Sequence, residues 1–436
     1  MALFNFSYYF GVFKILCSVP VGSGYSLCVV EVKTSIFCLM SNSSKSLSPE
    51  NSTFNMEANK KIQFNQPYMT GKELDYIADA HYNGRLAGDG PYTRMCHQWL
   101  EENTHCEKAL LTHSCTAALE MSALLIDVKP GDEIIMPSYT FVSTANAFVL
   151  RGGIPVFVDI RPDTLNIDEN LIESAITERT KAVVPVHYAG VPCEMNVILS
   201  IAEKYKLYVI EDAAQGLFSS YDGRPLGSLG DLSALSFHET KNVISGEGGA
   251  LLINDTSFIN HAEMVREKGT DRSRLFRGEV DKYSWQTVGS SYLPGELIAA
   301  FLWAQFEKAQ DITKARLLLW ERYHQLLEPF EQAGLFKRPS IPLNCRHNAH
   351  MYYVLVNDSN TRARVLNYLK ARGILAIFHY IPLHDSPAGK KYARVHGSLE
   401  YTSDLSDRII RLPLWIGLTD EKLQRVVDNL IKALTD

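Results

Sequence analysis

The chain has 436 residues, of which 46% are hydrophobic and 21% charged, and its net charge at pH 7 is −6. These totals are those of an ordinary globular protein with two or three domains. Without a basic excess they argue against general binding of nucleic acid or of an acidic membrane surface. The eight cysteines include no CxxC pair, so neither a disulfide framework nor a metal site is expected, and a cytoplasmic location suits them.

Residues 1–60 differ in composition from the rest of the chain. The apolar run at 3–21 lacks a basic start and is interrupted by a lysine and a proline, which makes it a poor signal peptide or membrane span. The Ser-rich run at 41–53 is expected to be disordered. Two interpretations are open: a weak targeting or anchoring segment, or an extension outside the fold with Met40 or Met56 as the natural start. We favour the extension.

From about Gln63 helices and strands alternate. Amphipathic stretches predict helices, and short apolar runs bounded by turn residues predict strands. The predicted helices are 71–83, 93–103, 115–126, 143–151 and 194–205, and the predicted strands are 109–112, 133–137, 155–158, 181–186, 207–211, 234–237 and 250–254. This alternation indicates an α/β fold with a mostly parallel central sheet flanked by helices. We assign residues 63–310 to this large domain.

The pattern changes beyond about residue 310. A long helix is predicted at 315–331, and two strand–helix pairs follow, 351–356 with 362–372 and 374–378 with a closing helical region that ends at 434. This order is typical of a smaller α+β domain, which we assign to residues 311–436.

Hydroxyl side chains open one predicted helix in the run SCTAALEMSALL, which begins at Ser114. A strand that turns into a helix here directs main-chain N–H groups and the positive end of the helix dipole at one spot, as in a phosphate site. Serine and threonine also cap helices that bind nothing, so capping alone is the alternative.

Two acids end an apolar strand in the run VIEDAAQG. Glu211 and Asp212 lie at the carboxyl end of that strand, the edge at which open α/β sheets bind ligands. A carboxylate buried there needs a partner, and the protonated ring nitrogen of pyridoxal phosphate is one such partner. A helix-capping aspartate is the alternative.

The run SFHETKNVISGEGG, residues 236–249, joins two short apolar strands and contains Lys241. A lysine at a crowded strand end loses water, which lowers its pKa and favours the nucleophilic amine. A solvated loop lysine is the commoner case. Combined with the upstream acid and the Ser/Thr anion site, Lys241 completes an arrangement typical of pyridoxal-phosphate sites, and Ser236 would add a hydroxyl for the phosphate.

Ordered runs spread from about Gln63 to the C-terminus resemble those of one family: GDGPYTRMCHQWLE, SCTAALEMSALL, GDEIIMPSYTFVSTANAFVLRGG, PVHYAGV, EDAAQG, SFHETKN, GEGGALLIND, REKGTDRS, NAHMYYV and FHYIPLH. The chain thereby resembles the DegT-type sugar-nucleotide aminotransferases, members of the fold-type-I pyridoxal-phosphate enzymes. The resemblance implies that fold, pyridoxal 5'-phosphate as cofactor, and a homodimer with its active sites at the subunit interface.

Residue roles follow from the resemblance at matching positions. Lys241 in SFHETKN is similar to the lysine that binds the cofactor covalently and moves the proton at the donor's Cα. The other implied cofactor contacts are Asp212 at the ring nitrogen, Gln215 near the phenolic oxygen, Phe141 stacked on the ring, and Thr116, Ala117 and Ser236 around the phosphate. The implied sugar-nucleotide contacts are His187, Lys268, His379, Tyr380 and His384. The alternative for Phe141 is core packing. For each single His and Lys residue the alternative is a structural or solvated role.

The reaction implied by the resemblance transfers an amino group from L-glutamate to a dTDP-linked 4-keto-6-deoxyhexose, for a cell-surface polysaccharide such as lipopolysaccharide or enterobacterial common antigen. Related sugar dehydratases carry histidine in place of Lys241, so the lysine argues for transamination. Many relatives also have an asparagine that reaches the partner's phosphate where GSSYLPGEL has Ser291. The alternatives are a relative that acts on another keto sugar or at C3, and a non-catalytic protein that binds pyridoxal phosphate or a sugar nucleotide.

Overall fold

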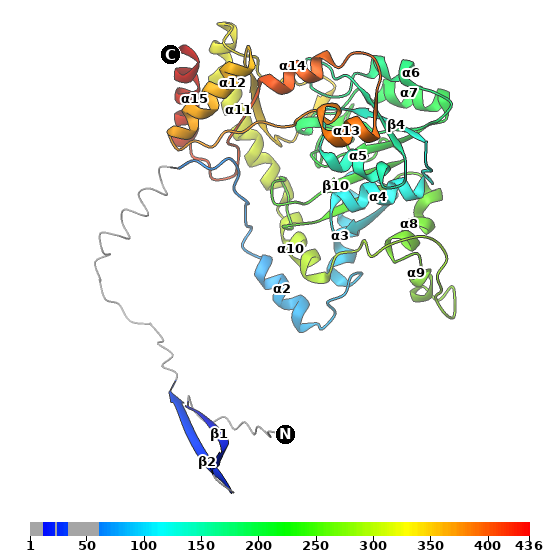
Figure 1. Cartoon of the computed structure of the whole chain (residues 1–436), viewed down its shortest axis with the longest axis vertical. Helices are drawn as coiled ribbons and strands as arrows, with labels where there is room; N and C mark the ends of the chain where they lie inside the picture. Colours follow the sequence, from blue (N-terminus) through cyan, green and yellow to red (C-terminus); the bar gives the residue numbers. More distant parts are fainter. Residues whose placement is uncertain (1–11, 22–23, 34–60) are drawn as a thin grey trace, which may run out of the picture. The chain divides into compact units, whose positions relative to one another are not determined.

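The computed structural model describes residues 12–21, 24–33 and 61–436, which fall into two units, Met1–Ala58 and Asn59–Asp436 (Figure 1). In the first unit β1 (Val12–Val21) and β2 (Gly24–Lys33) pair antiparallel. The sequence pattern predicts no strand there. The disorder predicted for 41–53 lies outside the described residues.

An eight-stranded sheet forms the centre of the second unit (Figure 1). Its order is β14-β5-β4-β6-β7-β10-β11-β3, and its pairs are parallel except those of β11 with β10 and β3. The strands are β3 (Lys108–Thr112), β4 (Glu133–Pro137), β5 (Ile154–Val158), β6 (Thr180–Val183), β7 (Tyr208–Asp212), β10 (Leu232–Ser236), β11 (Gly249–Ile253) and β14 (Arg394–Val395). The mostly parallel sheet expected from the sequence is confirmed.

Helices cover both faces of this sheet because successive side chains of a strand point to opposite sides. In β11, Leu251 belongs to the core beneath α4, α5 and α8, whereas Leu252 belongs to the core beneath α3 and α10. The helices of the large domain are α2 (Glu73–Tyr82), α3 (Pro91–Thr104), α4 (Cys115–Leu125), α5 (Val142–Val149), α6 (Ile172–Ala175), α7 (Met195–Tyr205), α8 (Ile259–Arg266), α9 (Arg272–Phe276) and α10 (Glu296–Phe306). The flanking helices expected from the sequence are therefore present.

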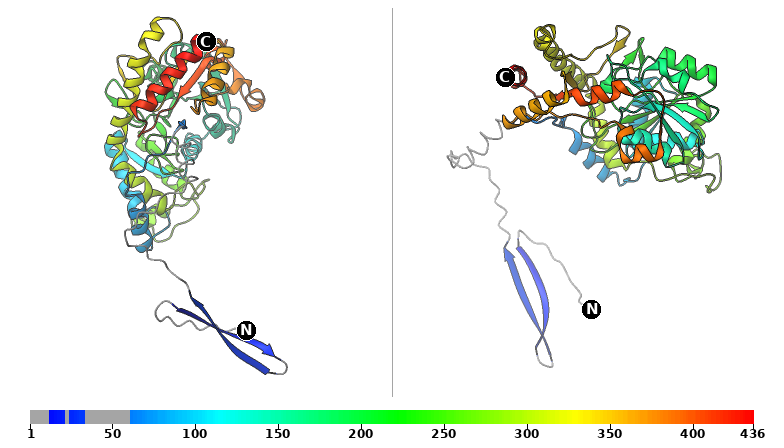
Figure 2. Two further views of the ribbon diagram at one scale, coloured as in Figure 1. Left: turned by 90° about the vertical axis from the view of Figure 1, so that its left-hand side faces the viewer. Right: turned by 45° about the horizontal axis from the view of Figure 1, so that its top comes forward.

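A smaller group of elements follows along the chain. β13 (Tyr352–Leu355) and β15 (Ile409–Leu412) pair antiparallel, and α11 (Ala309–Gln332), α12 (Ser359–Ala371) and α15 (Asp420–Thr435) pack around their core (Figure 2). The remaining short elements are β8 (Ser220–Tyr221), β9 (Arg224–Pro225), β12 (Cys345–Arg346), α13 (Pro387–Tyr392), α14 (Glu400–Arg408) and the 3-10 turns η1 (Glu169–Leu171), η2 (Tyr188–Gly190), η3 (Thr256–Phe258) and η4 (Leu383–Asp385).

The strand predicted at 374–378 is wrong. In this run only Ile374 and Ile377 make isolated bridges, to Ile62 and Arg411, so the apolar residues pack without forming a ladder. The antiparallel partner of β13 is β15 instead. An arginine inside β15 and a proline directly after it hide the strand pattern in the sequence.

Two segments cross the domain boundary that the sequence suggests. β14, from the C-terminal part of the chain, joins the edge of the large sheet beside β5. Ile62, from the N-terminal part, is buried in the core of the small group of elements. The domain bounds 63–310 and 311–436 stay a prediction. They do not take into account that β14 pairs with the large sheet and that Ile62 packs in the small core.

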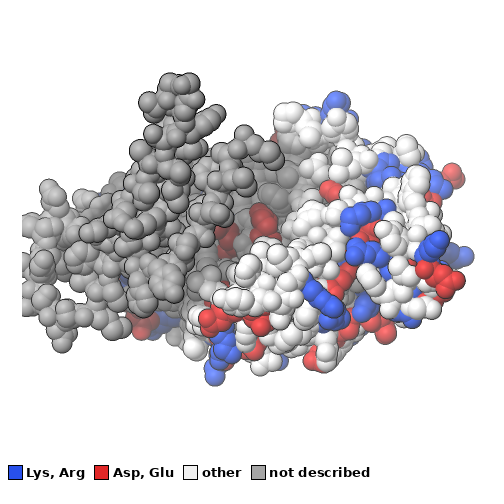
Figure 3. Space-filling view, turned by 90° about the horizontal axis from the view of Figure 1, so that it is seen from below, with Lys and Arg blue, Asp and Glu red and all other residues white. Residues whose placement is uncertain are grey.

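Charged side chains of both signs lie interspersed over the coloured part of the surface in Figure 3. Among the described residues, no helix has the length and apolar character needed to cross a bilayer. Within the same residues, no group of three or more His, Cys, Asp or Glu side chains is placed to hold a metal ion.

Candidate active site

A cavity of about 510 Å³ lies at the carboxyl ends of β7 and β10. Its walls come from the first turns of α4 and α5, from the connection between β10 and β11, and from segments that follow α12. Open α/β sheets bind ligands at this edge because the loops after the strands converge there. Lys241 and Asp212 both line the cavity.

Lys241 enters the cavity from the connection between β10 and β11. The connection folds on itself: the N–H of Lys241 donates to the carbonyl of His238 at 2.9 Å, and the N–H of Glu239 donates to that of Gly246 at 2.8 Å. The side-chain amine makes no hydrogen bond or ion pair within residues 61–436. Burial lowers the pKa of Lys241; Cys115 and Asp212 partly offset this, and the charge of Arg411 adds to it. The amine is therefore free to act as a nucleophile and a base.

Asp212 is the last residue of β7 and is held rigidly at the cavity wall. Its Oδ2 accepts a hydrogen bond from the hydroxyl of Thr144 at 2.6 Å, and its Oδ1 accepts one from the N–H of Ala214 at 3.2 Å. These neutral donors orient the carboxylate without neutralising it. It can therefore pair with a cationic group in the cavity.

Glu211 and His187 form a buried pair on the opposite side of β7. Glu211 Oε2 lies 3.0 Å from His187 Nε2, and Nδ1 of the ring accepts the N–H of Cys193 at 3.1 Å. Burial alone would raise the pKa of Glu211, yet the hydrogen bonds from His187 and from main-chain N–H groups hold it below its usual value. Both ring nitrogens of His187 are used and the residue is fully buried outside the cavity lining, so the structure does not bring it to the cavity, and its substrate contact stays a prediction.

The first turn of α4 lines the cavity at the place where the sequence predicts an anion cradle. Ser114 caps the helix through the N–H of Ala117 at 3.1 Å, and the hydroxyl of Thr116 lies 2.7 Å from that of Ser143. The N–H groups of Cys115 and Thr116 have no carbonyl partner in their own helix. The N–H of Ala117 is occupied by the cap, so its role at a phosphate stays a prediction.

Gly249 brings this cradle close to Ser236. In the sheet Gly249 pairs with Ser236 on one side and with Thr112 on the other. A Cβ on Gly249 would lie 2.4 Å from the nitrogen of Cys115 and 2.4 Å from the carbonyl carbon of Ser114. Only a glycine lets the start of α4 approach the sheet this closely.

Aromatic and amide groups form a further part of the cavity wall. Phe141, the N-cap of α5, is 56% exposed and lines the cavity, and its ring centre lies 6.1 Å from that of Tyr380. Gln215 donates to the hydroxyl of Tyr380 at 3.2 Å and accepts the N–H of Ala189 at 2.7 Å. An open aromatic face beside a fixed amide suits a planar heteroaromatic ligand.

His379 lies next to Tyr380 in the same wall. Arg411 Nη1 donates to His379 Nδ1 at 2.7 Å, because arginine can only donate. Burial lowers the pKa of His379 far below its usual value, and the charges of Arg411 and Lys241 lower it further. The ring is therefore neutral, and its Nε2, 3.1 Å from the hydroxyl of Tyr188, carries the proton.

Two expected substrate residues lie outside this cavity. Lys268 pairs with Glu267 at 3.0 Å and its N–H donates to the carbonyl of Ser290. His384 is 2.7 Å from the hydroxyl of Ser138 through Nδ1. Neither side chain lines the cavity of its own chain, so the two predicted contacts are not made there.

The residues that sequence reasoning missed are Ser143, Thr144 and Arg411, all of which touch or line the site. The hydroxyl-rich run that follows Phe141 is a signal for the first two. For Arg411 the signal is a charged residue inside an otherwise apolar strand, which is costly without a ligand or partner.

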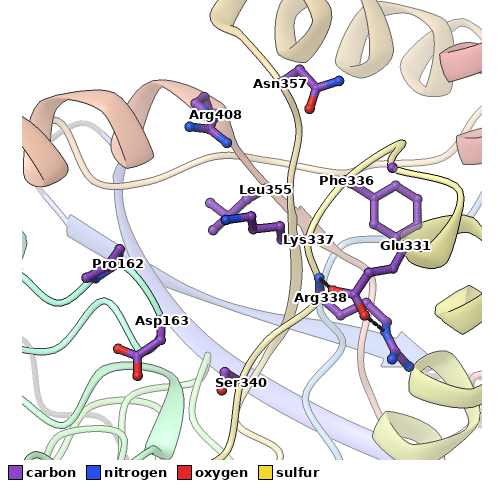
Figure 4. Close-up of a pocket in the computed structure, with 11 residues that line it drawn as sticks. Pro162, Asp163, Glu331, Phe336, Lys337, Arg338, Ser340, Leu355, Asn357 and Arg408 are labelled. Atoms are coloured by element: carbon purple, nitrogen blue, oxygen red, sulfur yellow. Dashed lines mark hydrogen bonds and ion pairs between the residues drawn. The ribbon is translucent and has the colours of Figure 1, made fainter.

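A second cavity, of about 570 Å³, has a different character (Figure 4). Its charged groups are largely satisfied by neighbours: Glu331 accepts the N–H and the Nε of Arg338 at 2.6 and 2.5 Å, as the dashed lines show. Arg408 donates to the carbonyl of Val356 at 2.7 Å. The smaller cavity, with its unpaired amine, is the better candidate for chemistry.

The smaller cavity fits pyridoxal phosphate. Hydroxyls and free N–H groups at the start of α4 suit a phosphate, the carboxylate of Asp212 suits a protonated ring nitrogen, and the exposed ring of Phe141 suits stacking. The unpaired amine of Lys241 suits an aldehyde. With the mostly parallel sheet, this site defines the class: a pyridoxal-phosphate-dependent enzyme of fold type I.

Comparison with known proteins gives the family. Residues 67–431 match the DegT/DnrJ/EryC1/StrS aminotransferase family, and the chain belongs to it. It is 31% identical to the spore coat polysaccharide biosynthesis protein SpsC of Bacillus subtilis, over 87% of this chain and 97% of SpsC. It is also 31% identical to GDP-perosamine synthase of Caulobacter vibrioides, over 86% of this chain and 98% of that enzyme.

A solved structure supports the same conclusion. NtdA from Bacillus subtilis, with bound cofactor PMP, superposes with a TM-score of 0.76 at 29% identity, over 84% of this chain and 83% of NtdA. The protein is therefore a sugar aminotransferase that uses pyridoxal phosphate and acts on a nucleotide sugar and an amino donor.

Proposed function

We propose that the enzyme transfers the amino group of L-glutamate to C4 of dTDP-4-dehydro-6-deoxy-D-glucose and so forms dTDP-4-amino-4,6-dideoxy-D-galactose. The observation that carries the transamination is the unpaired amine of Lys241 in one cavity with Asp212. The choice of sugar, nucleotide and carbon rests on the resemblance of the sequence runs to dTDP-4-amino-4,6-dideoxygalactose transaminase. The printed name of SpsC supports a product for surface polysaccharide.

Pyridoxal phosphate supplies an electron sink when it is bound. In the proposed reaction Asp212 holds a proton at the ring nitrogen, and Thr144 and the N–H of Ala214 keep its carboxylate in place. Lys241 takes the proton from the donor's Cα and returns it, because its lowered pKa makes the neutral amine available. Gln215 and Phe141 line the same cavity and would hold the ring of the cofactor in place during these steps.

The homodimer is part of the proposal. The segment between Lys268 and Ser291 exposes large apolar side chains, of which Trp285 is 79% and Phe276 69% exposed. Apolar groups exposed together mark an interaction surface, and a second copy of the chain would cover them. Ser291 is exposed outside its own chain's cavity, as a residue that reaches the partner's site must be. Lys268, beside Ser290, would contact substrate there.

A GDP-linked keto sugar is the second candidate, favoured by the identity to GDP-perosamine synthase. To separate the two, purified enzyme is offered dTDP-, GDP- and UDP-linked sugars with a keto group at C3 or C4, and NMR locates the new amine. We expect preference for the dTDP-linked 4-keto sugar and an amine at C4. An amine at C3 or preference for another nucleotide would contradict the proposal.

We also propose a cytoplasmic location. The described cysteines at 96, 106, 115, 193 and 345 are free thiols, the state that a reducing compartment maintains. Cell fractionation with an antibody against the chain tests this location, and recovery with secreted proteins would contradict it.

A further inference from the structure

Tyr139 and Tyr188 are two phenols that lie behind the wall of the cavity containing Lys241. Both side chains are fully buried, and neither lines the cavity. Tyr139 follows β4, Tyr188 begins the 3-10 turn η2, and both belong to a core against which Tyr380 packs. A buried hydroxyl costs free energy unless it has a hydrogen-bond partner. Both phenols find theirs at His379, in the segment that forms the wall.

Hydrogen bonds join Tyr139, Tyr188 and His379 in a closed ring. Nε2 of His379 lies 3.1 Å from the hydroxyl of Tyr188, and that hydroxyl lies 3.3 Å from the hydroxyl of Tyr139. The hydroxyl of Tyr139 in turn donates to the main-chain carbonyl of His379. The ring therefore begins at the side chain of His379 and ends at the main chain of the same residue.

The direction of this ring is determined because each of its donors has a single proton. Arg411 can only donate, and it donates to Nδ1 of His379 at 2.7 Å, so the proton of the neutral imidazole is on Nε2. Nε2 therefore donates to Tyr188, Tyr188 donates to Tyr139, and Tyr139 donates to the carbonyl, which can only accept. Both phenols keep the protons that these bonds need, since burial raises the pKa of each.

The ring fixes Tyr380, the residue next to His379. The ring centre of Tyr380 lies 4.0 Å from that of His379, on which it stacks, and 5.7 Å from that of Tyr139. The hydroxyl of Tyr380 accepts the amide of Gln215 at 3.2 Å. Gln215 in turn accepts the N–H of Ala189, in turn η2, at 2.7 Å. Tyr380 is thus tied at both ends to the segments that carry the two phenols.

Tyr380 also keeps a proton to give. Among residues 61–436 its O–H has no acceptor, whereas both ring nitrogens of His379 are engaged. Burial raises the pKa of Tyr380, so the hydroxyl is protonated, and the residue lines the cavity. An oxygen atom of a substrate in the cavity can accept this hydrogen bond.

We propose that Tyr139 and Tyr188 are positioning residues of the transamination, whose ring of hydrogen bonds with His379 holds the hydroxyl of Tyr380 where a substrate oxygen accepts from it. This inference rests on the proposed function in that the substrates are taken to enter this cavity. Hydrogen bonds that run in one direction polarise one another, so the ring acts as a unit. Neither phenol lines the cavity, so their effect on the rate passes through Tyr380.

The experiment removes one hydroxyl at a time from the holoenzyme and measures steady-state kinetics with L-glutamate and the keto sugar. For Tyr139→Phe and for Tyr188→Phe we expect kcat to fall about tenfold, because the donor of Tyr380 is misplaced in the transition state. Both KM values should change less than about threefold. The double variant should be at most about twofold slower than either single one, since one lost hydroxyl already opens the ring.

Tyr380→Phe separates positioning from a structural role. In the Tyr380→Phe background the further loss of kcat caused by Tyr139→Phe should be less than about twofold, because the phenol acts through Tyr380. The melting temperature should instead fall in both backgrounds, since Tyr139→Phe removes buried hydrogen bonds in each. Losses of kcat that multiply, or single variants with the kcat of wild type, would overturn the inference.

Tyr353→Phe is the matched control. Tyr353 is buried, its ring centre lies 6.0 Å from that of Tyr188, and its hydroxyl makes no hydrogen bond within residues 61–436. We expect kcat and both KM values to be unchanged. If Tyr139→Phe yields no folded holoenzyme, Tyr188→Phe decides the matter by the same comparisons.

NMR tests the ring without any substrate. In holoenzyme with isotope-labelled histidine, the Nε2–H of His379 should give an exchange-protected signal, assigned by its absence in His379→Gln. We expect Tyr188→Phe to move this signal upfield, because the N–H loses its acceptor, and Tyr353→Phe to leave it in place. An unchanged signal in Tyr188→Phe would overturn the inference. Failure of the proposed function is distinct: wild type would not react with glutamate or the dTDP sugar, yet this signal would still respond.

Discussion

At the scale of single residues, the site combines one unpaired base with groups that are fixed in advance. The amine of Lys241 has no partner, whereas Asp212 and Gln215 are each held by hydrogen bonds from or to their neighbours. A reacting group has to be free to change its bonds, and the groups that orient the ligand have to stay in place. This division supports the proposal that Lys241 carries out the proton transfers.

Replacing Lys241 with alanine should lower the rate of transamination by at least about 1,000-fold, since both the covalent hold on the cofactor and the base are lost. The measurement is turnover with glutamate together with the visible absorption of the lysine-bound cofactor, which should disappear. Lys370→Ala, at an exposed lysine of α12, should be unaffected. Turnover of Lys241→Ala at the wild-type rate would remove the catalytic role and favour a binding protein.

The lowered pKa of Lys241 predicts a shifted pH profile for cofactor capture by the apoenzyme. Only the neutral amine reacts, so a lower pKa brings the rise of the rate to lower pH. We expect the rate to level off clearly below the ordinary lysine pKa of about 10.4. Arg411→Met should move the profile upward in pH, because the charge of Arg411 contributes to the lowering. A midpoint at or above that of free lysine would contradict the prediction.

At the scale of elements, two helices of the large domain begin at a close contact with another segment. α4 begins against Gly249, and the N-terminus of α3 is held by Glu296, the first residue of α10. At Gly249 the contact leaves no room for a larger side chain. At Glu296 it needs a carboxylate to accept the first N–H groups of α3. The phosphate cradle is thus a property of packed elements rather than of the run SCTAALEMSALL by itself.

Gly249→Ala should disturb the cradle, because its Cβ would meet the main chain of Ser114 and Cys115. We expect a loss of about 1–3 kcal/mol in free energy of unfolding and weaker binding of cofactor to the apoenzyme, measured by titration. Gly295→Ala, whose nearest contact would be 3.3 Å from the carbonyl of Leu86, is the control with unchanged cofactor affinity. Equal affinities for all three proteins would contradict the role of Gly249.

Glu296→Ala should destabilise the large domain. The buried carboxylate accepts the N–H groups of Gly90, Tyr92 and Thr93 at 3.0, 2.9 and 3.1 Å, as well as the hydroxyl of Thr93. Losing these acceptors should lower the free energy of unfolding by about 1–3 kcal/mol in urea denaturation. Glu296→Gln keeps one carbonyl oxygen and should lose less. Equal stability of both variants and wild type would show that water replaces the carboxylate.

At the scale of the whole molecule, the cavity is assembled from distant parts of the chain. Asp212 ends β7 of the large sheet, and Lys241 lies in the connection between β10 and β11. Arg411 lies in β15 of the small sheet, and His379 lies in the segment that follows α12. The exposed apolar segment before Ser291 adds the expectation that a second copy completes the site. Both features make activity depend on how distant parts of the chain, and the two proposed subunits, are placed relative to one another.

Subunit mixing tests this dependence. Lys241→Ala and Ser291→Trp homodimers should each be inactive, but after exchange of subunits a hybrid dimer has one intact site. Activity should return to about one quarter of wild type if subunits assort at random. Sedimentation equilibrium checks that the particles are dimers. If mixing restores nothing, or if Ser291→Trp is fully active, Ser291 does not serve a partner's site.

The alternating apolar runs from residue 108 to 253 were enough to predict the α/β class, because a strand covered on both faces has to be apolar along its whole length. The same reasoning failed at β15, since an arginine interrupts it, and at 374–378, where apolar residues pack without a ladder. Local patterns report burial, and burial does not specify which strands pair.

For the site, the sequence predicted the lysine, its acid and the hydroxyl-rich helix start from local patterns at strand ends and helix starts, and the structure places all three at one cavity. Only the tertiary structure showed that His187 pairs with Glu211 away from the cavity, and that Lys268 and His384 lie outside their own chain's cavity. It also showed that Arg411 lines the same cavity as Lys241 and forms no ion pair with a carboxylate among residues 61–436. The physical reason is that a side chain's role depends on the neighbours that compete for its hydrogen bonds and charge, and those neighbours are far away in sequence.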